Sequence, residues 1–383
     1  MAKKKGKFRA EFRKNREKRT RRSDWTQQFE EHGFEEDETQ RGERLTGKGE
    51  LTRRRTVRGA EQETGEEPGF RIQLDVDETV CQPGRVLSVH GLISTVRAED
   101  GTLYQCATRR LLKTLSTDQR HVLAAGDRVR FRPVENTDIN TREGLIERVE
   151  PRRGSLCRTS RGRQHILVTN VDQVLIVASA AQPRLKPNLI DRLLVTTDKS
   201  GIRPVICINK IDLVEPASLQ PLVGIYSQMG YFVMLLSAKT GFGLERFQRT
   251  LVDRESVLAG QSGVGKSSLL NAIEPELGLR VRAVSEGSEK GRHTTTTAQL
   301  LPLRCGGYVV DTPGIRQFQL WDVIPEEVAG FYRDLRAYVS LCKYPNCTHT
   351  HEEECAVKDA VADGRLDERR YESYCHLFEG DWD

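Results

Sequence analysis

Hydrophobic and polar residues alternate in a series of short segments between Phe70 and about residue 155. The segments GRVLSVHGLISTV, TLYQCAT, DRVRFRPV and GLIERVEP alternate apolar and polar side chains, and turns with Gly or Asp separate them. Such alternation predicts half-buried antiparallel strands. About five short strands in this length predict an oligonucleotide-binding (OB) barrel over residues 69–155, although an SH3-like barrel fits the pattern almost as well.

From about Asn170 the pattern changes to continuous apolar runs. VDQVLIVASA, RPVICIN and FVMLLSA contain few polar residues, as expected for parallel strands that are buried on both faces. The helix-like segments NLIDRLLVTTDKS and GLERFQRTL alternate with these runs, which is typical of βαβ units. Residues 165–322 are therefore predicted to form an α/β domain.

The two ends of the chain have different patterns again. Residues 323–383 contain the helix-like EEVAGFYRDLRAYVSL and DERRYESYCHLFEG on either side of a Cys/His cluster, so we predict a small α-helical domain. Residues 1–68 carry few large apolar side chains; twelve of the first 22 residues are Lys or Arg, and an acidic patch follows at Glu30–Glu38. We expect a disordered tail there. Its basic run favours binding to nucleic-acid phosphates, but a solubilising tail that contacts nothing has the same composition.

The composition indicates a cytoplasmic protein. Charged residues make up 30% of the chain and hydrophobic residues 37%, which is a soluble composition. No run of about eighteen apolar residues is present, so no contact with a membrane is expected. The N-terminus lacks the apolar core of a secretory signal. Nine cysteines in a reducing cytosol are not expected to form a disulfide framework, so a tight Cys/His cluster indicates a metal site first.

The segment GQSGVGKSS matches the phosphate-loop pattern G-x-x-x-x-G-K-[ST] between an apolar run and a helix-like one. Glycines allow backbone N–H groups to turn towards phosphates, and the following helix presents its positive end to them. Lys266 is predicted to neutralise the β- and γ-phosphate oxygens, and Ser267 to bind Mg²⁺. The predicted nucleotide contacts are Gly260, Gln261, Ser262, Gly263, Val264, Gly265, Lys266, Ser267 and Ser268.

A second motif, Asn209-Lys-Ile-Asp212, ends the apolar run RPVICI and is typical of guanine recognition. The carboxylate of Asp212 can accept hydrogen bonds from N1–H and from the 2-amino group of guanine, and adenine offers no such pair of donors. Asn209 is expected to tie this loop to neighbouring backbone, and the stem of Lys210 to cover one face of the base. A further loop, Ser237-Ala238-Lys239, follows FVMLL and is expected to donate a backbone N–H to the guanine 6-oxo group.

The remaining parts of a GTPase site lie further along the chain. In Asp311-Thr-Pro-Gly314, Asp311 is expected to hold Mg²⁺ through water, and the Gly314 N–H to contact the γ-phosphate. The segment GRHTTTT is a candidate switch, in which Thr295 or Thr296 would complete the Mg²⁺ shell. The base-recognition motif therefore precedes the phosphate loop, which is the reverse of the ordinary order. The set is complete but circularly permuted, an arrangement that folds tolerate when the original termini lie close together.

This order of motifs resembles the RsgA (YjeQ) family of circularly permuted GTPases over roughly residues 70–365. The resemblance implies a multidomain protein with an OB-type barrel, a permuted P-loop GTPase domain and a small zinc-binding domain. It implies assistance in late assembly of the bacterial small ribosomal subunit, which stimulates GTP hydrolysis. The implied cofactors are GTP or GDP, Mg²⁺ and one Zn²⁺, and the implied partners are that subunit and its rRNA. We expect a monomer.

One catalytic position departs from the Ras-like pattern. Ile315 stands where Ras-like enzymes have a water-orienting Gln, so intrinsic hydrolysis is expected to be slow. With Lys266, the candidate catalytic residue is His293 in the switch segment, and the resemblance implies a water-orienting role for this histidine. The alternative is that His293 shapes the loop or contacts RNA.

The Cys/His cluster has the spacing C-x₄-C-x-H-x₅-C, which suits structural, tetrahedral Zn²⁺. His351 competes with His349 as the imidazole ligand, and the family pattern selects His349. Loss of zinc is expected to unfold this domain while sparing nucleotide binding. The predicted ligands are Cys342, Cys347, His349 and Cys355.

Three functions follow from these motifs. The first is a GTPase that docks on rRNA through its barrel and zinc domain and leaves on GTP turnover. The second is an RNA-binding module that uses GTP as a structural latch with negligible turnover, which Ile315 would favour. The third, a small-molecule kinase, is disfavoured by the base-recognition motif.

Overall fold

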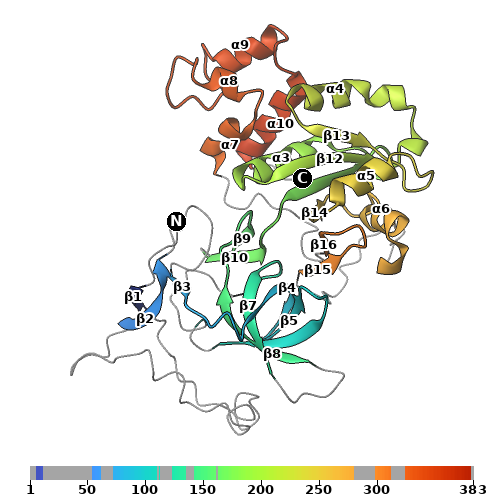
Figure 1. Ribbon diagram of the computed structural model, residues 1–383. Coiled ribbons are helices and arrows are strands. Elements are labelled where there is room, and N and C mark those ends of the chain that lie inside the picture. Colours follow the sequence, from blue (N-terminus) through green and yellow to red (C-terminus); the bar gives the residue numbers. More distant parts are fainter. Residues whose placement is uncertain are drawn as a thin grey trace, which may run out of the picture. The chain divides into compact units, whose positions relative to one another are not determined.

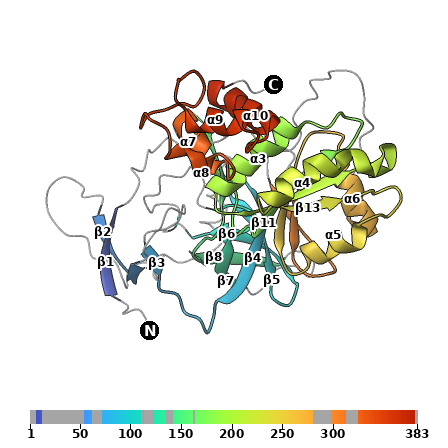
Figure 2. The ribbon, with the colours of Figure 1, turned by 90° about the horizontal axis from the view of Figure 1, so that it is seen from above.

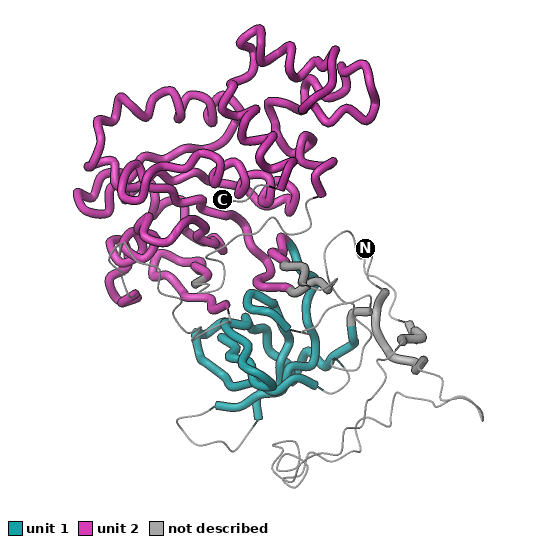
Figure 3. The backbone as a smooth tube through the Cα atoms, turned by 180° about the vertical axis from the view of Figure 1, so that it is seen from behind, with its two compact units in different colours: residues 1–153, 162–165 teal, residues 154–161, 166–383 magenta. Residues whose placement is uncertain are grey.

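The computed structural model is shown in Figure 1. It describes residues 6–11, 54–61, 72–109, 112, 123–134, 142–160, 163–279, 298–311 and 324–380. The backbone divides into two compact units, one of residues 1–153 with 162–165 and the other of residues 154–161 with 166–383 (Figure 3). The predicted GTPase and zinc-binding segments thus share one unit.

The first unit contains a closed barrel with the strand order β4-β5-β6-β8-β7. β6 and β8 are parallel, and the other neighbouring strands are antiparallel. A parallel contact between the third and fifth strands is the Greek-key arrangement of an OB fold, which resolves the choice between the two predicted barrels. The barrel strands are β4 (Gln82–His90), β5 (Ile93–Ala98), β6 (Leu103–Thr108), β7 (Arg128–Pro133) and β8 (Glu143–Val149).

The barrel interior is filled by side chains from alternate positions of these strands. Val86, Val96, Cys106, Phe131 and Ile146 are fully buried in one cluster, and each comes from a different strand. Because successive side chains of a strand point to opposite faces, this alternation of buried and partly exposed residues follows directly from the sequence pattern.

A small antiparallel sheet, in the order β1-β2-β3, precedes the barrel. Its strands are β1 (Gly6–Glu11), β2 (Arg54–Glu61) and β3 (Ile72–Leu74), and all six residues of β1 pair with β2. The expectation of a disordered tail over residues 1–68 does not hold for these two segments. Backbone pairing can satisfy N–H and C=O groups without a large hydrophobic core, and a prediction from apolar content alone overlooks this.

The second unit is built on a six-stranded sheet with the order β13-β12-β11-β14-β16-β15. β15 is antiparallel to β16, and the other neighbours are parallel. The strands are β11 (Gln173–Ser179), β12 (Arg203–Asn209), β13 (Phe232–Leu235), β14 (Glu255–Ala259), β15 (Gln299–Pro302) and β16 (Tyr308–Asp311). A separate hairpin of β9 (Leu156–Ser160) and β10 (Arg163–Val168) comes before them in the chain.

Helices lie on both faces of this sheet, so every residue of β11 is buried. One core joins Leu175, Val177 and Cys207 of the sheet to Phe247 of α5 and Leu269 of α6. On the other face, α3 contacts β11 and β12. The helices are α3 (Pro187–Lys199), α4 (Gln220–Gln228), α5 (Leu244–Leu251) and α6 (Lys266–Ile273).

The C-terminal helices gather beside α3, and both α7 and α10 contact it (Figures 1 and 2). The predicted helical segment that begins near Pro325 is divided into two helices, with a turn after Tyr332. No helix within the described residues is long and apolar enough to span a membrane. The C-terminal helices are α7 (Pro325–Phe331), α8 (Arg336–Val339), α9 (Ala356–Ala362) and α10 (Glu368–Glu379).

Candidate nucleotide and metal sites

The predicted nucleotide-binding segments meet at one edge of the parallel sheet. β12 ends at Asn209, Ser237 comes shortly after β13, and Gly260 directly follows β14. Because these strands are parallel, their carboxyl ends lie along the same edge, where α/β sheets bind ligands. The phosphate loop, Gly260–Ser267, follows the fourth strand of the sheet in chain order, so the permuted arrangement is present in the fold.

Two glycines of the phosphate loop stand where a side chain would collide with backbone or a buried amide. Gly260 has φ of +140°, and a Cβ atom there would lie 2.0 Å from the carbonyl oxygen of Val177 on β11. Gly265 has φ of +96°, and its Cβ atom would lie 2.4 Å from Nδ2 of Asn209. The loop therefore packs tightly against β11 and the base-recognition motif, and α6 begins immediately after it.

Lys266 spans this loop from the first residue of α6. Its Nζ donates to the carbonyl oxygens of Gly260 and Gln261, at 2.7 and 2.9 Å. The ammonium group is thus held across the loop whose backbone is predicted to surround the phosphates. A cation at this place suits the neutralisation of phosphate oxygens.

Gly260→Ala is expected to abolish nucleotide binding and to lower the free energy of unfolding by about 3 kcal/mol or more. The new Cβ atom meets backbone, which cannot move without displacing β11. Gly201→Ala is the matched control, because Gly201 has φ of +64° and open space around it, and should cost only about 1 kcal/mol. Chemical denaturation and titration with a fluorescent GDP analogue measure both effects. Equal losses in the two variants would contradict the close-packing argument.

Asn209 connects three loops at this edge. It is 1% exposed, its Nδ2 donates to the Val264 carbonyl oxygen at 2.9 Å, and its Oδ1 accepts from the backbone N–H of Ala238 at 3.2 Å. The base-recognition motif is therefore fixed to the phosphate loop on one side and to the Ser237-Ala238-Lys239 loop on the other. This is the tie to neighbouring backbone that the sequence predicts for Asn209.

Asp212 is oriented by a buried serine. The Ser237 hydroxyl donates to Asp212 Oδ1 at 2.6 Å, and it accepts from the backbone N–H of Thr240 at 3.2 Å. Ser237 is fully buried, whereas Asp212 is exposed. One carboxylate oxygen is thus anchored, and the side chain is turned so that it can accept hydrogen bonds from a ligand.

Lys210 adopts the left-handed backbone conformation, with φ of 61°, and its Nζ donates to the Gln182 carbonyl oxygen. Partial burial lowers the pKa of Lys210, although Asp212 acts in the opposite direction. No sequence pattern predicts this bond, because Gln182 lies on a loop that carries no recognisable motif. The bond joins the base-recognition motif to the loop between β11 and α3.

Four predicted residues of the switch segments lie outside the described residues: His293, Thr295, Thr296 and Gly314. Asp311 is the last residue of β16, whose parallel neighbour β14 leads into the phosphate loop, so its backbone lies at the expected edge. Its side chain also lies outside the description.

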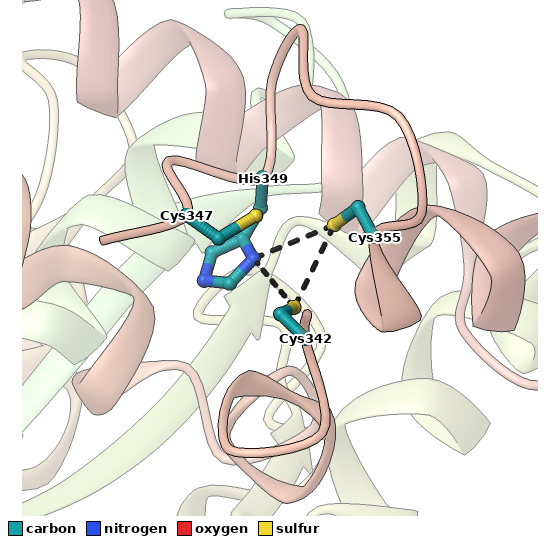
Figure 4. A group of neighbouring side chains, drawn as sticks. All are labelled: Cys342, Cys347, His349 and Cys355. Carbon is teal, nitrogen blue, oxygen red and sulfur yellow. Dashed lines mark hydrogen bonds between the residues drawn. The ribbon is translucent and has the colours of Figure 1, made fainter. Parts of the chain in front are cut away.

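The four predicted zinc ligands come together in the C-terminal region (Figure 4). Their ligand atoms all lie within 4.8 Å of one another. The Sγ atoms of Cys342 and Cys355 are 3.8 Å apart and lie 3.3 and 3.5 Å from Nδ1 of His349. Tetrahedral zinc has S···S separations of about 3.8 Å and S···N separations of about 3.5 Å, given Zn–S bonds of about 2.3 Å and Zn–N bonds of about 2.0 Å. The donor set and its spacing therefore fit Zn²⁺ closely.

The competing imidazole does not join this group. His351 is exposed, and its ring lies near Thr348 and Thr350. His349 is 2% exposed, and burial lowers its pKa, which favours the neutral form that binds metals. Burial also raises the pKa of the Cys347 thiol to about 12, so a thiolate there needs a neighbouring cation.

Helix α10 holds the ligand loop in place. The hydroxyl of Tyr371 donates to the His349 carbonyl oxygen at 2.8 Å, and that of Tyr374 to the Thr348 carbonyl oxygen at 2.7 Å. The two rings stack with centroids 6.4 Å apart. Neither tyrosine was predicted from the sequence, although two tyrosines three apart on a predicted helix are a usable signal for a shared face.

Comparisons with known proteins agree with this geometry. The family model described as RsgA GTPase matches residues 149–321. The small ribosomal subunit biogenesis GTPase RsgA of Sodalis glossinidius (strain morsitans) is 39% identical over 306 residues, which are 78% of this chain and 86% of that protein. The protein of the same name from Yersinia enterocolitica is 39% identical over 307 residues, covering 78% of this chain and 85% of the relative.

Two solved structures share the fold. The crystal structure of YjeQ from Thermotoga maritima has a TM-score of 0.62 at 36% identity and covers 78% of this chain and 98% of its own. That of YloQ, a circularly permuted GTPase, has a TM-score of 0.60 at 30% identity and covers 80% and 97%.

Proposed function

The chain belongs to the RsgA GTPase family, and on that premise we propose that it hydrolyses GTP while bound to the maturing small ribosomal subunit. Membership makes the chain a GTP hydrolase and disfavours both the latch without turnover and the small-molecule kinase. The proposal of the subunit as partner is supported by the names of the relatives. Contact with the rRNA of that subunit, a monomeric state and a cytoplasmic location belong to the same proposal.

The residues at the sheet edge have separate roles in this proposal. Asp212 binds the guanine edge, Lys210 covers one face of the base, and Asn209 holds their loop against the phosphate loop. Lys266 and the loop backbone bind the phosphates. With Mg²⁺ bound, the site gains a charge that neutralises phosphate oxygens, and Ser267, Asp311 and Thr295 or Thr296 are its proposed ligands.

The switch segments supply the remaining proposed contacts. The Gly314 N–H contacts the γ-phosphate, and His293 orients the attacking water because Ile315 cannot do so. Zn²⁺ is proposed to bind Cys342, Cys347 and Cys355 through sulfur and His349 through Nδ1, as a structural ion.

The observation that carries the proposal is a pair of hydrogen bonds from one loop: the Ser237 hydroxyl donates to Asp212, and the backbone N–H of the next residue, Ala238, donates to Asn209. These bonds orient a carboxylate for guanine at a fixed position relative to the phosphate loop. A phosphate loop alone would bind any nucleotide, whereas this connection selects GTP over ATP.

Hydrolysis of GTP and ATP, with and without purified small ribosomal subunits at near-physiological salt, tests the proposal. We expect slow GTP turnover by the chain alone, since Ile315 cannot orient water, and stimulation of about 100-fold or more by the subunit. The rate of ATP hydrolysis should not change when the small subunit is added. Large ribosomal subunits are the matched control. Tight GTP binding with no stimulated turnover would contradict the proposal and favour the latch.

A further inference from the structure

Helix α3 lies between the nucleotide site and the zinc-binding region, which is residues 324–380 and contains the C-terminal helices and the ligand cluster. On one side, its residues Leu189, Ile190 and Leu193 line a depression together with Gly260, Gln261 and Val264 of the phosphate loop. On the other side, Val195 belongs to the hydrophobic core of the C-terminal helices. One rigid element therefore touches both regions.

Arg370 of α10 forms the central contact between α3 and the zinc-binding region. The residue is 1% exposed; its guanidinium lies 2.5 Å from a carboxylate oxygen of Asp191 on α3 and donates twice to Asp334, at 2.9 Å each. The guanidinium also stacks over the Tyr332 ring, 4.3 Å from its centroid. Asp191 is fully buried and accepts from the Tyr226 hydroxyl of α4 at 2.6 Å. Because a buried carboxylate is costly without its partner, Asp191 strongly favours the docked position of α10.

A second arginine makes a similar contact in the last turn of α3. Arg333 donates twice to Asp198, at 2.8 and 3.1 Å, and lies 4.1 Å from the centroid of the Tyr231 ring. Lys199 also pairs with Glu327 of α7 at 2.6 Å. Three charged side chains of one helix, Asp191, Asp198 and Lys199, thus bind the zinc-binding region.

The start of α3 is held from the nucleotide side. The loop that leads into it carries Gln182, whose carbonyl oxygen accepts from Lys210 of the base-recognition motif. The strand before that loop, β11, is the strand against which Gly260 packs. A shift of α3 therefore changes the surroundings of both the base-recognition motif and the phosphate loop.

We propose that α3 links nucleotide binding to docking of the zinc-binding region, and that Arg370 and Arg333 are positioning residues for the nucleotide site. Docking holds α3 in the position in which the phosphate loop is preformed. Linkage is reciprocal, so nucleotide must strengthen docking by the same factor by which docking strengthens nucleotide binding. The inference rests on the proposed nucleotide site, but it needs no ribosomal subunit.

Arg370→Gln in the full chain tests the linkage by GDP affinity and by hydrogen exchange of α10. We expect GDP to bind about tenfold more weakly and α10 amides to exchange faster, while the zinc content stays unchanged. In the native chain, saturating GDP should slow exchange of α10 amides by a similar factor. Arg249→Gln, which removes an exposed ion pair on α5, is the matched control and should leave both measurements unchanged.

Arg333→Gln provides a second variant if Arg370→Gln does not fold, because Arg333 is only partly buried. Its GDP affinity should fall by about threefold, in the same direction. Two outcomes would overturn the linkage. In the first, the variants show faster α10 exchange but an unchanged GDP affinity. In the second, the variants bind GDP more weakly, but GDP does not change α10 exchange in the native chain. Failure of the native chain to bind GDP would instead overturn the proposed nucleotide site, and the linkage with it.

Discussion

Asp212→Asn is expected to change the preference of the chain from guanine to xanthine nucleotides. The carboxylate accepts from the N1–H and 2-amino groups of guanine, whereas an amide presents one donor that faces the 2-amino group and meets no acceptor. An unpaired donor in a closed contact is costly, so GDP affinity should fall by about 10⁴-fold. Xanthine carries a 2-oxo group at that position, and XDP affinity should rise correspondingly.

The hydroxyl of Ser237 determines how the amide of the Asp212→Asn variant is oriented. It donates to Asp212 Oδ1, and the same bond to the amide oxygen of the variant would turn the amide N–H group towards the base. Glu215→Gln is the matched control, because it makes the same change of charge on an exposed residue of the same loop. Competition of GDP and XDP against a fluorescent GDP analogue gives both affinities. Unchanged guanine selectivity in Asp212→Asn would remove Asp212 from the proposed base-recognition site.

The contacts that recognisable motifs make could be predicted from the sequence, because the chemistry of a motif determines the kind of partner that it needs. Asn209 was expected to bind neighbouring backbone, and it binds Val264 and Ala238. The zinc spacing likewise predicted a cluster whose ligand atoms are close together, and the fold excludes His351 from it. The zinc ligands lie in one short segment, Cys342–Cys355, so the sequence spacing carries their geometry, whereas the bond from Asn209 to Val264 joins two motifs.

Contacts between distant segments that carry no motif could not be predicted in this way. Arg370 meets Asp191 across the fold, and in the sequence each is only one more charged residue on a helix. Nothing in a helical pattern distinguishes a solvated arginine from a buried one before the packing partner is known. The link between α3 and the C-terminal helices therefore emerges only from the three-dimensional arrangement.

In the barrel, too, the sequence pattern predicts the strands but not which strands are neighbours. Alternation predicted the strands around Val86, Val96 and Phe131, and these residues do fill the interior. Because alternation does not determine strand order, it could not decide between an OB and an SH3-like barrel. The parallel pairing of β6 with β8 is a non-local contact that no local pattern encodes.

Cys355→Ala is expected to remove zinc and to unfold the C-terminal helices. Cys355 is 1% exposed and belongs both to the ligand cluster and to the hydrophobic core of those helices. Structural zinc contributes about 10–16 kcal/mol in zinc-finger peptides, and a core of this size supplies only about 3–5 kcal/mol. Zinc content should therefore fall from one ion per chain to none. Trypsin should then cleave at the arginines of α10, where the buried Arg370 is protected in the folded chain.

Cys375→Ala is the matched control for this prediction, because Cys375 lies on α10 beside the same core but outside the ligand cluster. It should keep zinc and resist trypsin. The sequence alone predicted that zinc loss would spare nucleotide binding, but the contacts of α3 lead us to expect weaker binding instead. Unfolding of the C-terminal helices deprives Asp191 and Asp198 of the same partners that Arg370→Gln and Arg333→Gln remove singly. GDP affinity in Cys355→Ala should thus fall by at least the roughly tenfold expected for Arg370→Gln, but GDP binding should not be abolished, since the parallel sheet keeps its own core. A zinc-free chain whose α10 still resists trypsin would contradict a structural role for the metal.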